Sequence, residues 1–148
     1  MKISFLEKKY FFLYLFVSVF VFCNHLLASP FSSININSLN IAKTNEIKNF
    51  FNNKKTEGIF YDNSKFIEVF YGDGNFELEF LEGEYKGFYK GKWKAQNDSI
   101  CFLYQNTNDY DCSRILYTND NSGNLKVYLG SQEGVFAEII SVNDLNVQ

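Results

Sequence analysis

The sequence has very little histidine, proline or cysteine, and these shortages exclude several kinds of chemistry. Its single histidine, His25, lies in an N-terminal segment that we expect to be removed. The remaining chain would then lack a Ser-His-Asp or Cys-His nucleophile, a histidine-ligated zinc site and an imidazole acid or base. One proline and an aromatic content of 19% favour strands over disorder. We therefore expect a folded β protein that is not an enzyme.

Basic charge is also scarce. The formal net charge is −3, and it becomes −5 once three lysines and one glutamate are lost with residues 1–28. A nucleic-acid binder needs a basic excess to contact phosphates, so we expect no nucleic-acid partner.

The N-terminus has the pattern of a signal peptide over residues 1–28. Three lysines precede the apolar run 10–22, and Ala28 closes a short polar-to-small region. The run of about 13 residues is shorter than the ~20 needed to span a bilayer. We predict cleavage after Ala28 and an exported protein, periplasmic or secreted, that meets the membrane only during export.

Two alternatives remain open for this segment. The apolar stretch continues through Leu26 and Leu27, so an uncleaved anchor is one of them. The other is a lipoprotein acylated at Cys23, although Val21 and Phe22 are bulkier than the residues that usually precede such a site.

Two cysteines, Cys101 and Cys112, remain after Cys23 is removed, and an exported chain would pair them. The predicted disulfide would close a loop of ten residues. It would stabilise the fold by about 2 to 3 kcal/mol through restriction of the unfolded chain. Two buried free thiols are the alternative.

The mature chain reads as a flexible leader over 29–43 and a single β-barrel domain over 44–148. Thr44 can cap a short helix that runs to about Asn52 and plugs one end of a sheet. Eight segments with alternating apolar residues follow, separated by short turns. No second helix is long enough for a parallel crossover, so we predict an all-β, antiparallel up-and-down meander that closes into a small barrel. The predicted strands are 56–61, 65–71, 75–81, 85–95, 99–104, 112–119, 125–129 and 134–141.

The turns also predict a strand register. A two-residue turn at Glu82-Gly83 would pair Phe80 with Tyr85 and Phe76 with Tyr89. A turn at Asn97-Asp98 would pair Trp93 with Phe102, and would let Cys101 face Cys112 on the next strand. The first hairpin, with Tyr71 opposite Phe76, would place Glu68 opposite Glu79 on the outer face.

One strand face suggests a ligand site. Gly87 and Gly91 alternate with Tyr85, Tyr89 and Trp93, which leaves the barrel interior either hollow or filled by the aromatic rings. In the hollow case, a pocket would hold an apolar or aromatic ligand in the barrel or at its mouth. The tentative ligand-binding residues are Tyr89, Trp93, Phe102 and Tyr104.

The charged residues have structural explanations that we prefer to functional ones. The lysines of 86–94 face Glu77 and Glu79, which fits a solvated sheet face better than a catalytic carboxylate pair. Asp109, Asp111 and Asp120 match no complete calcium loop. Asn97-Asp98-Ser99 matches a glycosylation acceptor but coincides with the predicted turn. We expect no metal and no cofactor.

Three segments carry a resemblance to known proteins. The blocks 89–93, 97–104 and 109–112 resemble those of small exported proteobacterial proteins of uncharacterised function. Those proteins carry a G-x-W pattern, a D-x-x-C-F-x-Y pattern and a later cysteine after a signal peptide and a short helix. The resemblance implies a lipocalin-like or avidin-like β-meander and gives no activity.

A more distant similarity, through Trp93-Lys94, Asp98 and Cys101, is to the periplasmic inhibitors of secreted metalloproteases. In those inhibitors, which share the barrel type, a free N-terminal tail enters the protease cleft. This similarity implies the alternative function, a protein-interaction or inhibitor module with a packed core. Such a module would act through the tail 29–40 or through the outer lysine face of 86–94.

Overall fold

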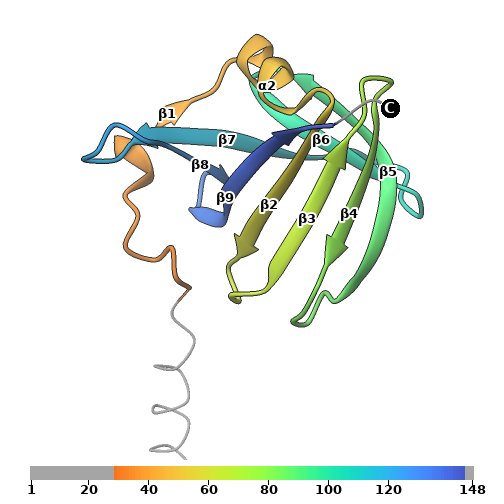
Figure 1. Ribbon diagram of the computed structural model, residues 1–148, viewed down its shortest axis with the longest axis horizontal. Coiled ribbons are helices and arrows are strands. Elements are labelled where there is room, and N and C mark those ends of the chain that lie inside the picture. Colours follow the sequence, from red (N-terminus) through yellow and green to blue (C-terminus); the bar gives the residue numbers. More distant parts are fainter. Residues whose placement is uncertain (1–28, 146–148) are drawn as a thin grey trace, which may run out of the picture.

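The computed structural model describes residues 29–145, which form an antiparallel sheet with one α-helix (Figure 1). The predicted signal peptide, and with it the alternatives of an uncleaved anchor and of a lipoprotein acylated at Cys23, lies outside the described residues. No helix within residues 29–145 is long and apolar enough to cross a membrane. The elements are η1 (Ile36–Ser38), β1 (Asn40–Ile41), α2 (Thr44–Phe51), β2 (Lys54–Phe60), β3 (Lys65–Phe70), β4 (Asn75–Phe80), β5 (Gly87–Gln96), β6 (Ser99–Tyr104), β7 (Asp111–Asn119), β8 (Leu125–Gly130) and β9 (Val135–Asp144).

Strands β2 to β9 form a closed barrel. Each strand pairs with the next one along the chain, and β9 returns to pair with β2 from Lys54 to Phe60. The predicted up-and-down meander of eight strands is therefore confirmed, with its short N-terminal helix.

The sequence gives no sign of β1, which lies in the segment predicted to be a flexible leader. Strand β6 pairs with β7 only from Ile100 to Phe102. Beyond that point, β1 takes the place of β6 and pairs Asn40 with Tyr117. Phe31, earlier in the same segment, is only 6% exposed. The leader segment thus packs against the barrel at two places.

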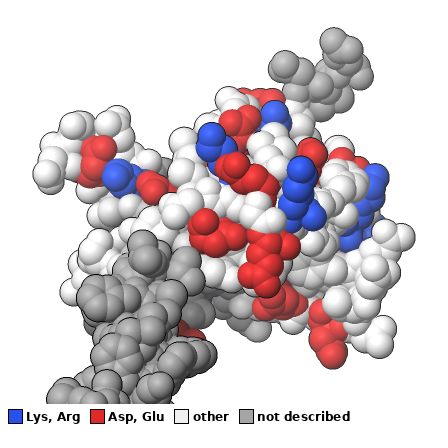
Figure 2. All heavy atoms as spheres, turned by 90° about the horizontal axis from the view of Figure 1, so that it is seen from below, with Lys and Arg blue, Asp and Glu red and all other residues white. Residues whose placement is uncertain are grey.

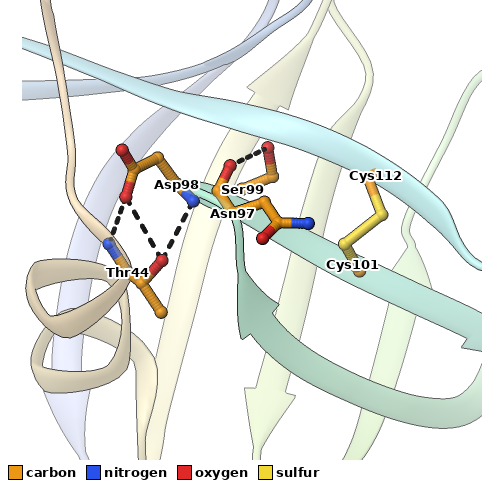
Figure 3. The surroundings of a disulfide bond; sticks show 6 residues. All are labelled: Thr44, Asn97, Asp98, Ser99, Cys101 and Cys112. Atoms are coloured by element: carbon orange, nitrogen blue, oxygen red, sulfur yellow. Dashed lines mark hydrogen bonds between the residues drawn. A yellow bond between two sulfur atoms is a disulfide. The ribbon is translucent and has the colours of Figure 1, made fainter.

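The predicted hairpin at Asn97-Asp98 is confirmed. Both residues have positive φ angles, 51° and 55°, as a two-residue hairpin turn requires. The turn pairs Trp93 with Phe102, and the next strand places Cys112 opposite Cys101. The two cysteines form the predicted disulfide (Figure 3).

The predicted register of β4 and β5 is wrong by two residues. Phe80 pairs with Gly87, and Phe76 pairs with Gly91. The cause is the connection, which takes up residues 81–86 instead of a two-residue turn. A shift of two residues leaves every side chain on its predicted face.

The predicted register of β3 and β4 is wrong by one residue, which has a larger effect. Phe70 pairs with Phe76, and Glu68 pairs with Leu78. The N–H of Tyr71 donates to the carbonyl oxygen of Asn75, so the turn is one residue shorter than predicted. Because side chains alternate between faces, this shift turns Glu68 from the outer face into the barrel.

Helix α2 closes one end of the barrel (Figure 1). Ile47 and Phe51 are completely buried, and the Phe51 ring lies 4.8 Å from that of Phe70. The helix N-cap is Lys43 and not Thr44 as predicted. Thr44 instead binds the β5–β6 turn, because its N–H donates to Asp98 Oδ1 and its Oγ1 accepts from the Asp98 N–H (Figure 3). The turn and the helix therefore hold each other in place.

Candidate ligand-binding cavity

A cavity of about 510 Å³ occupies the end of the barrel opposite α2. Its walls come from the inward faces of the strands, and Tyr85 and Gln105 to Thr107 place its opening among the connections at that end. Phe88 and Tyr89 lie at this rim and are 54% and 37% exposed. The rings that form the inner walls are those of Phe60, Phe66, Phe80, Phe102, Tyr104 and Phe136.

Three of the four predicted ligand-binding residues line this cavity: Tyr89, Phe102 and Tyr104. The fourth, Trp93, lies at the filled end of the barrel. Its indole packs edge-on against Phe70 with 5.4 Å between ring centroids, and its Nε1 donates to the Tyr71 carbonyl oxygen at 3.0 Å. The bulk of the indole therefore helps to fill the helix end.

Gly91 allows two parts of the barrel to approach closely. A Cβ at this position would lie 2.0 Å from the carbonyl oxygen of Leu103 and 2.8 Å from the Phe76 ring. The glycine therefore leaves room for the neighbouring strand β6 and for the Phe76 ring, which packs edge-on against Phe102 with 5.0 Å between the ring centroids.

The cavity contains a carboxyl group, that of Glu68, which was predicted to lie on the outer face of the sheet. Glu68 is only 5% exposed, and the sole donor that it meets among the described residues is the hydroxyl of Thr56, 3.2 Å from Oε2. Every fully buried side-chain oxygen and nitrogen in residues 29–145 has a hydrogen-bond partner. Glu68 Oε1 has none there, so this atom faces the open space of the cavity.

Burial changes the acid–base behaviour of Glu68. Desolvation of the charged form raises the pKa of its carboxyl group from 4.5 to about 7, against a smaller lowering by the Thr56 hydrogen bond. No lysine or arginine in the described part of the chain forms an ion pair with it. Near neutral pH, Glu68 is therefore divided between its neutral and charged forms.

Tyr104 lies beside this carboxyl group. Burial raises the pKa of its phenol, and the negative charges of Glu68 and Asp111 raise it further. Tyr104 thus keeps its proton and offers a hydroxyl to the cavity.

The lysines of β5 are engaged on the sheet and do not neutralise Glu68. Lys90 Nζ lies 2.9 Å from Glu77 Oε1, and Lys92 Nζ donates to Asn75 Oδ1. Lys94 Nζ lies 3.8 Å from the centre of the Tyr110 ring. These contacts agree with the structural explanation of the lysine face.

The cavity end of the barrel is acidic. Successive antiparallel strands run in opposite directions, so the connections 61–64, 81–86, 105–110 and 131–134 gather at this end. They contain five carboxylates and a single lysine, Lys86. The view from below shows acidic side chains in the middle of this face, with basic side chains beside and around them (Figure 2). The acidic residues of these connections are Asp62, Glu82, Glu84, Asp109 and Glu133.

No cluster of three or more histidine, cysteine or acidic side chains within residues 29–145 could hold a metal ion. Asp120, for which the sequence favoured a turn role over calcium binding, accepts hydrogen bonds from the N–H groups of Ser122 and Asn124 within its own turn. This is the behaviour of a turn residue.

Taken as a class, the chain is a closed antiparallel β-barrel with one filled end and one hollow end. No family model matches its sequence, and no curated protein or solved structure matches it significantly. Its function must therefore be argued from the cavity.

Proposed function

We propose that this protein is an exported, non-enzymatic binding module that holds a small apolar or aromatic ligand in its barrel. The observation that carries this proposal is the aromatic cavity of about 510 Å³. Sites for small molecules are mostly apolar clefts of about 300 to 1,000 Å³ with a few polar groups. This cavity has that size and that composition.

The uneven filling of the barrel supports the proposal. At the helix end, the Phe70 ring packs against both Phe51 and Trp93, and these rings fill the interior. At the other end, Phe88 exposes 54% of its surface beside the cavity. Exposed apolar surface next to a pocket is typical of a site that a partner or ligand covers.

Export is the part of the proposal that the disulfide supports. The Cys101–Cys112 bridge is stable in an oxidising compartment and rare in a reducing cytosol. We place the protein in the periplasm or outside the cell.

A protein-interaction or inhibitor module is the second candidate, and the structure gives less support for it. Phe31 is buried and β1 pairs with β7, so part of the proposed tail lies against the barrel. On the lysine face, Lys90 is paired with Glu77. We therefore rank this function below ligand binding.

Titration with N-phenyl-1-naphthylamine, a neutral apolar dye whose fluorescence rises in apolar surroundings, tests the proposal. We expect saturable binding with a micromolar Kd, as for other small ligands of this size. Trp93 is unsuitable as the reporter because it does not line the cavity.

A matched pair of variants locates the dye. Ser113 lines the cavity, so Ser113→Phe should fill part of it and weaken dye binding by about tenfold or more. Ser122 lies exposed in the β7–β8 turn, so Ser122→Phe adds the same bulk outside and should leave binding unchanged. Absence of saturable dye binding to the unaltered protein would overturn the proposal.

A further inference from the structure

The buried carboxyl group of Glu68 specifies the chemistry of the ligand, and this inference rests on the proposed binding function. We propose that the ligand is an organic amine whose apolar or aromatic body lies among the rings of the cavity. Its ammonium group would donate hydrogen bonds to Glu68 Oε1.

The position of Glu68 carries the proposal. The side chain is 5% exposed, yet its oxygens receive one donor from the described residues, the hydroxyl of Thr56. A buried carboxylate is costly unless hydrogen bonds or an opposite charge compensate for it. An ammonium group in the cavity would supply hydrogen bonds and a positive charge to Oε1, the oxygen that lacks a partner within residues 29–145.

The aromatic walls suit the same ligand. Rings such as those of Phe66, Phe102 and Tyr104 offer apolar surface for a hydrocarbon or aromatic body. Their faces also attract a cation through the negative lobes of their quadrupoles. The Thr56 hydroxyl holds Glu68 Oε2 at 3.2 Å, which fixes the direction in which the carboxyl group points.

The other charged groups around the cavity also favour a cation. Asp111 also lines the cavity, and Lys90, the one basic residue that the described part of the chain contributes to the lining, is paired with Glu77. Outside, the connections around the opening contain five carboxylates and one lysine. Such a field attracts cations and repels anions, so a fatty acid or another carboxylate would be disfavoured.

The protonation of Glu68 should respond to such a ligand. Burial raises the pKa of Glu68 to about 7, and a bound ammonium group would lower it. Amine binding should therefore weaken below neutral pH as Glu68 takes up a proton. Thr56 on β2 is hydrogen-bonded to Glu68. The other titratable groups in the described lining of the cavity are those of Tyr85, Tyr89, Lys90, Tyr104 and Asp111.

Displacement of the bound dye at pH 8 by three indoles that differ in one group tests the inference. Tryptamine carries an ammonium group, tryptophol a neutral hydroxyl and indole-3-acetate a carboxylate. We expect tryptamine to displace the dye at concentrations about tenfold or more below those of tryptophol, because charge-assisted hydrogen bonds are stronger than neutral ones. Indole-3-acetate should be the weakest.

Two variants assign this preference to Glu68. Glu68→Gln keeps the size and the acceptor for Thr56, and it should lower tryptamine affinity about tenfold or more while tryptophol changes less than about twofold. Glu79→Gln removes the same charge from the outer face of β4 and should change neither.

The outcomes separate the two proposals. Dye binding without a preference for tryptamine, or a preference that Glu68→Gln leaves intact, would overturn the amine inference and leave ligand binding standing. Absence of dye binding would overturn both.

Discussion

At the scale of single residues, Glu68 shows what the sequence contained and how it was misread. Phe66, Glu68 and Phe70 share one face of β3, so the alternation alone would have placed the carboxyl group between two core rings. The expected turn before Phe76 outweighed that signal and put Glu68 outside. The one-residue difference in the turn decided which face the carboxyl group occupies.

Trp93 shows a different limit. Its inward direction was predicted and is confirmed by its burial, at 7% exposure. Alternation assigns a side chain to a face of the sheet but gives no information on which half of the barrel is hollow. That depends on where α2 docks, which is a long-range contact.

The stability of the fold should depend on pH through Glu68. The unfolded chain ionises this group near 4.5, whereas the folded chain keeps the proton to about 7. Its contribution is therefore fully present below pH 4.5 and is lost as the pH rises through 7, by about 3 kcal/mol in the free energy of unfolding. We expect Glu68→Gln to remove this loss, measured by urea unfolding between pH 4 and 8.

The difference between variant and unaltered protein isolates Glu68 in this experiment. Asp62, Asp73, Asp98 and Asp120 have lowered pKa values because of hydrogen bonds to their carboxylates, so they stabilise the fold above their ordinary range. Their effect on stability is the same in both proteins, and its pH dependence lies at lower pH than that of Glu68. Parallel stability profiles for the two proteins would contradict the assignment.

At the scale of elements, the strands were predicted well and the connections poorly. The eight barrel strands follow from alternation and turn residues, and the Asn97-Asp98 hairpin even gave the correct register. The connection 81–86 contains Glu82-Gly83, which was predicted to form a tight turn, but it adopts a longer path. The pairing of β1 with β7 has no local signal, because a two-residue strand is too short to show alternation.

The contact between α2 and the β5–β6 turn should be important for stability. Asp98 accepts from the Thr44 N–H and pairs with Lys43 at 3.0 Å, so Asp98→Ala leaves the helix start without its acceptor. We expect the melting temperature to fall by about 4 °C. Asp98→Asn keeps an oxygen for the Thr44 N–H, so its melting temperature should fall less. An equal fall for both variants would show that the charge of Asp98, and not its hydrogen bond to the helix start, matters.

The disulfide should stabilise the place where β6 and β7 separate. These strands pair at only three positions, and Cys101–Cys112 is the middle one. Replacing both cysteines by serine should lower the free energy of unfolding by about 2 to 3 kcal/mol in urea titrations. Reductant should cause the same loss in the unaltered protein and none in the variant. If the variant were as stable as the oxidised protein, the bridge would have no structural role.

At the scale of the whole molecule, the barrel divides into a filled half and a hollow half. The helix end is filled by Ile47, Phe51 and the rings they contact. The opposite end leaves about 510 Å³ open and carries the acidic rim. Composition and alternation predict the closed barrel, but the hollow half follows only from the summed volumes of side chains in three dimensions.

The most direct test of the binding site is an NMR map of the backbone amides during addition of N-phenyl-1-naphthylamine. We expect saturable shifts at Glu68, Phe102, Tyr104 and Ala137, whose side chains line the cavity, and small shifts across α2. Shifts confined to α2 or to the lysine face of 86–94, or no saturable shifts at all, would contradict the assignment of the cavity as the ligand site.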